Sequence, residues 1–162
     1  LTGTLAPAFR QEGHVILNGR DVTTLPTEHR RIGILFQDDL LFPHLSVGQN
    51  LAFGLAKGGT RTERRAKIET SLADVGLEGF HDRDPATLSG GQKARVALMR
   101  MLLSAPEALL LDEAFSGLDP ALREQIRALV FTRARTLNLP VVMVTHDPAD
   151  AEAAGGPILK IG

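Results

Sequence analysis

The sequence lacks several features that would place it in a common functional class. It has no cysteine, which excludes disulfide bonds and thiolate metal sites and fits a reducing compartment. Its formal net charge of −1 gives neither a basic field for nucleic acid nor an acidic solvating tail. It shows no secretory signal and no apolar run near the roughly 20 residues that cross a bilayer. We therefore expect a soluble protein, which would work at a membrane only by docking to something that spans it.

A phosphate-binding loop is also absent. No G-x-x-x-x-G-K-[ST] motif occurs in the 162 residues, and no lysine follows a glycine. Two other motifs are present: Leu88-Ser89-Gly90-Gly91-Gln92 and, further along the chain, Leu109-Leu110-Leu111-Asp112-Glu113. The first predicts a glycine-rich turn that opens a helix, and the second predicts a buried strand that ends in two carboxylates. Together they indicate a protein that handles a nucleoside triphosphate and Mg²⁺.

The order of the apolar segments predicts an α/β fold. Residues 32–36, 108–111 and 141–144 are short apolar runs, and the last two lack alternation, which is typical of strands covered on both faces of a parallel sheet. A helix predicted from Pro120 to about Leu137 separates these two runs. Strand, helix and strand with short links favour a mostly parallel core sheet with flanking helices. Residues 13–19, with an Asn-Gly turn, predict an antiparallel hairpin near the N-terminus.

Between about residues 45 and 104 the pattern becomes helical. A helix is predicted from Ser89 to Leu103, and apolar residues before it recur at helical spacing. These apolar residues are Val47, Leu51, Leu55, Ile68, Leu72 and Val75. We therefore expect a single, partial domain over residues 1–162, with a core from 1–44 and 105–162 and a helical insertion from about 45 to 104.

Polar side chains at predicted strand ends are the candidates for chemistry. Asp112 can hold Mg²⁺ beside a phosphate, and Glu113 can orient or deprotonate the water that attacks the terminal phosphate. Gln37 and His146 follow the other two apolar runs, and a histidine there can bond the γ-phosphate. Taken singly, each has a plainer interpretation: acids that cap a strand, a solvated glutamine, or a histidine bonded to Asp147 or to the backbone.

The segment at Ser89 is the candidate anion site. A serine N-cap followed by Gly90 and Gly91 exposes backbone N–H groups at the positive end of a helix dipole. Standing alone, the segment would be an ordinary capped helix. Asp119 also has two interpretations. It is the expected N-cap of the next helix and is part of a candidate functional loop, and the two roles are compatible.

These motifs, in this order, resemble those of the ATPase subunits of ATP-binding cassette (ABC) transporters of the small bacterial importer type. The resemblance runs from the first residue to the last. It implies a P-loop NTPase-like core with a helical subdomain, ATP and Mg²⁺ as ligands, and a head-to-tail dimer in which the serine turn contacts the partner's ATP. The site residues that it implies are Glu113 and His146 for catalysis, Asp112 and Gln37 for the metal and nucleotide, and Ser89, Gly90, Gly91, Gln92 and Asp119 for the nucleotide.

The resemblance also bears on the N-terminus. Residues 1–7 resemble the end of the helix that follows the phosphate loop, so the Walker A segment that grips the β- and γ-phosphates is missing from this span. We expect this span alone to bind ATP very weakly and to hydrolyse none usefully.

The partners implied by the resemblance are a second ATPase subunit and transmembrane permease subunits, with no nucleic acid. The implied location is cytoplasmic, on the inner face of the cell membrane. Leu41, Phe42, Leu45 and Val47 are expected to form an apolar patch beside Gln37 for the permease.

Two alternatives remain at this point. One is a non-catalytic cassette remnant that acts as a binding module, and the other is an ABC ATPase without a transport role. Against the DNA-repair type, Ser89 lies only 52 positions (89 − 37) after Gln37, which leaves no room for long coiled coils.

Overall fold

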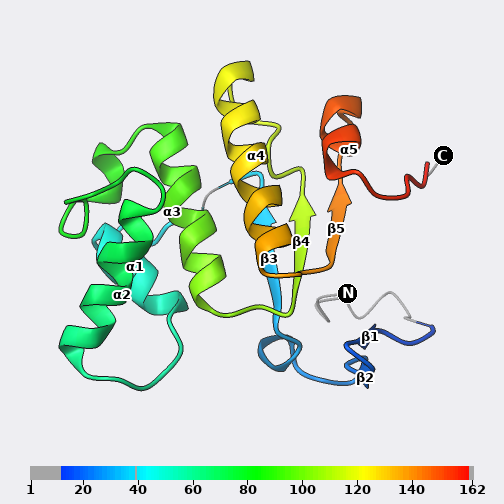
Figure 1. Ribbon diagram of the computed structural model, residues 1–162, viewed down its shortest axis with the longest axis horizontal. Helices are drawn as coiled ribbons and strands as arrows, with labels where there is room; N and C mark the ends of the chain where they lie inside the picture. The colour runs from blue at the N-terminus through cyan, green and yellow to red at the C-terminus, as the bar shows by residue number, and fades with distance from the viewer. Residues whose placement is uncertain (1–11, 39, 161–162) are drawn as a thin grey trace.

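The computed structural model describes residues 12–38 and 40–160, and its centre is a three-stranded parallel sheet (Figure 1). The strands are β3 (Ile32–Phe36), β4 (Ala108–Asp112) and β5 (Val141–Val144), in the order β3-β4-β5. Their register aligns Phe36, Asp112 and Val144 at the carboxyl ends. The predicted α/β fold with a parallel sheet is therefore confirmed, and β3 and β5 have the expected bounds.

The described part of the chain forms five α-helices, which lie beside and along this sheet. In Figure 1, α1 to α3 form a group beside β3, α4 lies along the sheet, and α5 follows β5 at the opposite side. The helices are α1 (Val47–Gly54), α2 (Arg61–Ala73), α3 (Gly90–Leu103), α4 (Pro120–Thr136) and α5 (Pro148–Ala154), with short 3₁₀ turns η1 (Thr27–His29) and η2 (Pro85–Thr87). The boundaries of about 45 and 104 for a helical insertion stay a prediction. Among the described residues, no helix is long and apolar enough to span a bilayer.

Local sequence signals explain where the helices begin. Ser46, Thr60 and Ser89 each form a capping box with the residue three positions later. Asp119 and Asp147 cap α4 and α5 through their carboxylates and are each followed by proline at the first helical position; the cap at Asp119 was predicted.

The predicted hairpin near the N-terminus is present. Strands β1 (Ile16–Leu17) and β2 (Arg20–Asp21) pair antiparallel around Asn18 and Gly19. Both turn residues have positive φ, 49° and 76°, the conformation for which Asn-Gly is preferred in two-residue hairpin loops.

Within the described residues, two clusters of buried apolar side chains form the core. The first joins α1, α2 and α3, and its fully buried members include Val47, Leu51 and Leu72. The second packs Leu109 and Leu111 of β4 against α3 and α4. Val130 of α4 is completely buried there, as the helical spacing of its apolar residues predicted.

The expectation that both faces of the sheet are covered is wrong for β5 within the described residues. Alternation along the strands places Leu109 and Leu111 toward α4, while Val142 and Val144 point to the other face and are 50% and 54% exposed. Lack of alternation in the sequence indicates apolar side chains on both faces, but it does not show what lies against each face.

The approach of α1 to α3 depends on a glycine. A Cβ atom added to Gly54, the last residue of α1, would overlap the backbone carbonyl oxygen of Arg100 in α3. A backbone atom within a helix cannot move aside as a side chain can, so the two helices would have to separate.

We therefore predict that Gly54→Ala destabilises the protein by about 1–3 kcal/mol, the usual cost of overpacking. Gly156→Ala is the matched control, because a Cβ there meets nothing within 4 Å; its free energy of unfolding should stay within about 0.5 kcal/mol of wild type. Urea unfolding followed by circular dichroism measures both. Equal midpoints for the two variants would contradict the proposed contact.

Candidate functional site

The carboxyl ends of β3, β4 and β5 gather the candidate polar residues at one edge of the sheet. Gln37 follows β3 directly, Asp112 is the last residue of β4, and both are exposed. The pleat places Asp112 on the same face as Phe36 and Val144, its aligned neighbours, and opposite the face on which α4 packs. The two residues predicted to hold a metal therefore extend adjacent strands and are accessible.

Glu113 and His146 are in direct contact. Nδ1 of His146 lies 2.8 Å from Oε2 of Glu113, although neither motif in the sequence connects them. The imidazole is 77% exposed and the carboxylate 29% exposed, so the pair lies at the surface rather than in a sealed core. The plainer interpretation, in which His146 is bonded to Asp147, does not hold: the partner is Glu113.

The backbone at Glu113 fixes the direction in which its side chain leaves the strand. Its N–H donates to the carbonyl oxygen of Val144 at 3.0 Å, and its φ of 50° lies in the left-handed region. A non-glycine residue adopts this conformation at a cost, and residues held in this way cluster at functional sites. The chain thus turns sharply after Asp112, which separates the two neighbouring carboxylates.

The contact changes the acidity of the histidine. The hydrogen bond that the ring donates to Glu113, and the negative charge of that carboxylate, raise the pKa of His146 above its ordinary value of 6.5; Asp147 also raises it, while desolvation and Arg123 oppose the shift. A raised pKa means that the folded protein favours the protonated ring. The stabilising effect is therefore complete below pH 6.5 and is lost as the pH rises through the raised pKa.

The Ser89 turn is partly satisfied by its own helix. The Ser89 N–H donates to Oε1 of Gln92 at 3.0 Å, and the Gln92 N–H donates to Oγ of Ser89 at 3.3 Å. These bonds use two backbone N–H groups of residues that were predicted to face the nucleotide. The N–H groups of Gly90 and Gly91 belong to the first turn of α3, where the helix itself supplies no acceptor.

A hollow lies beside this turn. It has a volume of about 560 Å³ and is lined by the turn and by the loop that precedes α4, including Gly117 and Asp119. Gly91 allows the start of α3 to pack closely against α4, because a Cβ atom at this position would lie 2.5 Å from the Leu122 side chain of α4. Asp119 itself accepts the Leu122 N–H at 3.1 Å, as an N-cap should.

The structure thus forms two groups rather than one. Ser89, Gly90, Gly91 and Gln92 line one hollow with Asp119, whereas Glu113 contacts His146 at the sheet edge. None of Asp112, Glu113 and His146 lines the hollow at Ser89. The direct roles of all these residues toward nucleotide and metal stay predictions.

The oxygen atoms that Asp112 and Gln37 offer at the sheet edge suit Mg²⁺. Among the described residues, no group of three or more His, Cys, Asp and Glu forms a complete metal site. Mg²⁺ commonly takes only one or two protein oxygens and completes its shell with water and substrate phosphates. The carboxylate of Asp112 and the amide oxygen of Gln37 are ligands of this kind.

The apolar patch expected beside Gln37 is partly wrong. Val47 is completely buried in the core of α1, α2 and α3, and Leu41 packs against the same core. The exposed apolar residues of this region include instead Phe36 at 47%, Leu40 at 57% and Phe53 at 71%. The reason is that Val47 is the first residue of an amphipathic helix, whose apolar stripe faces inward.

Sequence reasoning did not identify Arg123 and Arg127 on α4. Arg123 bonds Asp147, the residue after His146, and the carbonyl oxygen of Ser116. Arg127 bonds Asp150 at 2.9 Å. The available signal was two arginines four residues apart on a helix that follows the Asp112-Glu113 motif, but their partners are distant in the sequence.

Comparisons with known proteins agree on one family. The sequence model described as ABC transporter matches residues 1–116. The chain is 52% identical over 153 residues to the uncharacterized ABC transporter ATP-binding protein YnjD of Escherichia coli K12, covering 94% of this chain and 70% of that protein. It is 46% identical to the thiamine import ATP-binding protein ThiQ of Jannaschia sp. CCS1, covering 94% of this chain and 66% of that protein.

Other relatives are considerably longer. The chain spans only 40% of the sulfate/thiosulfate import ATP-binding protein CysA of Mycobacterium tuberculosis, with 46% identity. Among solved structures, the dimeric post-hydrolysis state of the ATP-binding cassette MJ0796 bound to ADP and Pi is similar, with a TM-score of 0.71 and 33% identity. That likeness covers 88% of this chain and 66% of the MJ0796 chain.

The contact between Glu113 and His146 predicts a pH effect. Glu113→Gln should lower the pKa of His146 toward its ordinary value of 6.5, because the main cause of the shift is removed. Titration of the imidazole resonances by NMR measures it, with assignment by His146→Gln. Glu78→Gln is the control and should leave the His146 titration unchanged. An unaltered midpoint in Glu113→Gln would show that the two side chains are apart in solution.

Proposed function

Because the chain belongs to the ABC transporter family, we propose that the intact protein is the ATP-hydrolysing subunit of an ABC importer. The observation that carries this proposal is the Glu113–His146 contact beside Asp112 at the carboxyl edge of the parallel sheet. Open α/β sheets bind ligands at this edge. The chain offers an acid suited to a metal and an acid suited to a water molecule at the end of β4, and a histidine suited to a phosphate after the end of the neighbouring strand β5.

The side chains divide the hydrolysis among them. Glu113 orients a water molecule, and as the water oxygen bonds the γ-phosphorus, the carboxylate takes its proton. The bond from the γ-phosphorus to the bridging oxygen breaks, and ADP and inorganic phosphate are the products. Asp112 and Gln37 would hold Mg²⁺, which, when bound, neutralises part of the phosphate charge.

His146 changes partner in this proposal. In the structure Nδ1 of His146 lies 2.8 Å from the Glu113 carboxylate, which favours the protonated ring. A γ-phosphate carries more negative charge than a carboxylate and competes for the same imidazolium. Transfer of the ring to the phosphate would free the carboxylate for water, so ATP binding itself would assemble the base.

The second half of the site comes from another copy of the chain. The Ser89 hollow and the Glu113–His146 pair are separate groups within one chain. A head-to-tail dimer would bring the Gly90 and Gly91 N–H groups of one copy to the phosphates held by the other. The dimeric state of the similar cassette MJ0796, bound to ADP and Pi, supports this arrangement.

We expect the partner permease, and not this chain, to determine which substrate is transported. Relatives with similar identity are named for thiamine import, sulfate or thiosulfate import and Fe(3+) import, which are chemically unrelated solutes. What these relatives would share with this chain is therefore ATP hydrolysis and not the transported solute. These names support import over the alternatives of a non-catalytic remnant or a non-transport ATPase.

The surface for the permease lies beside Gln37, on the cytoplasmic face of the membrane. Phe53 and Leu40 are exposed there, and the rings of Phe42 and Phe53 pack edge to face with centroids 4.7 Å apart. A cavity of about 410 Å³ lies between this segment, β3 and α3. An apolar helix end from a membrane subunit would cover these side chains.

Replacing the proposed base tests the chemistry. Glu113→Gln should reduce kcat for ATP hydrolysis by about 10²- to 10⁴-fold, the usual contribution of general base catalysis, because an amide cannot take the proton. Affinity for MgATP should change less than about threefold, since binding does not use this proton. Glu124→Gln, an exposed change on α4, is the control. A variant Glu113→Gln that keeps more than half of the activity would exclude this role.

Crosslinking tests the docking surface. The chain has no native cysteine, so a single Phe53→Cys in the intact protein gives one reactive site within this chain. It should crosslink to the permease in membranes, and ATP should change the yield because docking geometry follows the dimer. Leu137→Cys, 52% exposed at the end of α4, is the matched apolar control and should give no product. Equal yields at the two positions would place the permease elsewhere.

A further inference from the structure

Arg123 connects the two loops that carry the candidate catalytic residues. From α4, its Nη1 bonds the carboxylate of Asp147, and its Nη2 donates to the carbonyl oxygen of Ser116 at 3.1 Å. Asp147 follows His146 in the chain, and Ser116 lies three residues after Glu113. One guanidinium therefore bonds both loops.

Further hydrogen bonds close this arrangement into a ring. The N–H and the hydroxyl of Ser116 both donate to the Glu113 carbonyl oxygen, at 3.1 and 2.9 Å. Glu113 then contacts His146 at 2.8 Å, and His146 is joined covalently to Asp147. Two sets of contacts thus hold the Glu113 carboxylate beside the His146 imidazole: their direct contact, and the bonds of Arg123 to the two loops.

The Arg123–Asp147 pair is largely withdrawn from water. The two side chains are 24% and 27% exposed, so their charge-assisted bond is less screened than a surface ion pair. The Nε of Arg123 is buried without a hydrogen-bond partner in the described residues. A buried unpaired donor costs stability, which indicates that the guanidinium is held for its geometry.

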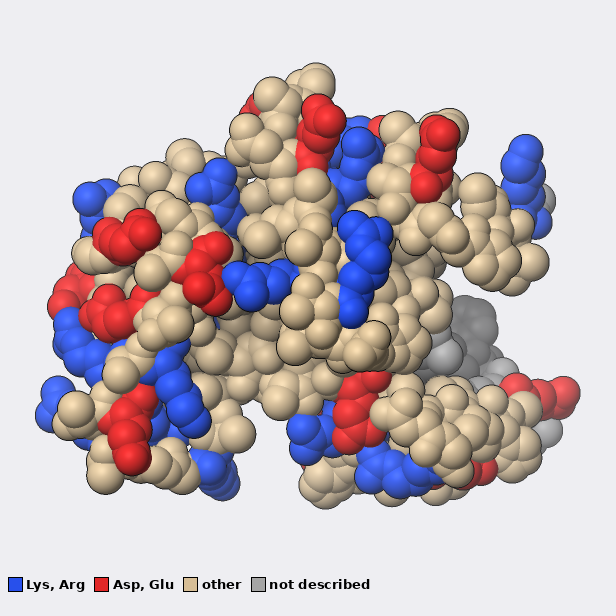
Figure 2. Space-filling view, in the orientation of Figure 1, with Lys and Arg blue, Asp and Glu red and all other residues tan. Residues whose placement is uncertain are grey.

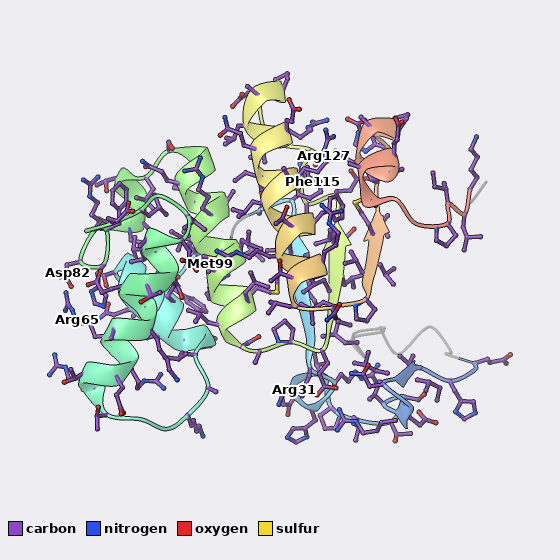
Figure 3. All side chains as sticks on the ribbon, in the orientation of Figure 1. Arg31, Arg65, Asp82, Met99, Phe115 and Arg127 are labelled. Atoms are coloured by element: carbon purple, nitrogen blue, oxygen red, sulfur yellow. The ribbon has the colours of Figure 1, made fainter. Side chains whose placement is uncertain are left out.

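A second pair anchors α5 independently. Arg127, one helical turn further along α4, bonds Asp150 at 2.9 Å, and Asp150 is only 2% exposed. The hydroxyl of Thr145 donates to the other Asp150 oxygen at 3.4 Å. Figure 3 shows the Arg127 side chain between α4 and α5. Removal of Arg123 should therefore release the loop while α5 stays docked.

We propose that Arg123 is a positioning residue, which holds the loops of Glu113 and His146 in register for ATP hydrolysis. This inference rests on the proposed function. A catalytic group displaced by about 1 Å loses about 10²-fold in rate, so a bond that sets its position has a kinetic effect without contact with the substrate. Arg123 is suited to this task because its planar fork can bond a carboxylate and a carbonyl together, which a lysine ammonium cannot do in the same geometry.

The kinetic test uses three variants of the intact protein: Arg123→Ala, Arg123→Lys and the control Arg135→Ala, an exposed arginine of the same helix. Arg123→Ala should lower kcat about 10- to 100-fold, with KM for ATP changed less than about threefold. Arg123→Lys should recover part of kcat because it keeps the charge but not both bonds. Arg135→Ala should match wild type.

A second readout does not depend on turnover. The imidazole resonances of His146 in the nucleotide-free protein should shift or broaden in Arg123→Ala, move back in part in Arg123→Lys, and stay unchanged in Arg135→Ala. If wild type hydrolyses no ATP, the proposed function fails, and the resonances still decide whether Arg123 positions the ring.

Two results would overturn the inference. One is kcat within twofold of wild type together with unchanged His146 resonances in Arg123→Ala. The other is a loss of kcat that only follows the folded fraction measured by thermal unfolding. If Arg123→Ala does not fold, Arg123→Lys decides by the same two readouts.

Discussion

The account depends on one constraint, the parallel register of β3, β4 and β5. Because Phe36, Asp112 and Val144 are aligned, the residues that follow each strand emerge at a single edge. Gln37, Glu113 and His146 are far apart in the sequence, yet each lies within two residues of an aligned position. Parallel strands require long crossovers, and here these crossovers are helices that also carry the second half of the proposed site. The register therefore sets both the chemistry and the surfaces available to partners.

Helix α4 has a double role in this arrangement. One face buries Ile126 and Val130 against the sheet, and its arginines reach across to α5. The packing energy of the apolar face keeps the helix in place, so its polar face can hold loops in position. On the face shown in Figure 2, acidic and basic side chains are interspersed over the α1–α3 region. The charged contacts beside the candidate site are instead the partly buried Arg123–Asp147 and Arg127–Asp150 pairs between α4 and the start of α5.

The sequence predicted what depends on local pattern. Apolar runs located β3 and β5, and Ser89 and Asp119 marked the helix starts, because capping is decided within a few residues. It did not predict contacts between distant segments. Periodicity cannot show that His146 faces Glu113 rather than Asp147, that Arg123 bridges two loops, or that Val47 faces the core rather than a permease. The Gln92 side chain illustrates a further limit, since a residue marked by a motif can be used within its own helix.

Mixed dimers test the shared site most directly. Ser89→Arg and Glu113→Gln should each inactivate the intact protein, but in an equal mixture half of the dimers pair one variant with the other and carry one intact site each. The account predicts recovery to roughly a quarter of wild-type ATPase activity. A chain with both substitutions, mixed with wild type, should give mixed dimers with no intact site. If the single variants fail to complement, while mixed dimers with the double variant keep one active site, each site belongs to one chain and the account is contradicted.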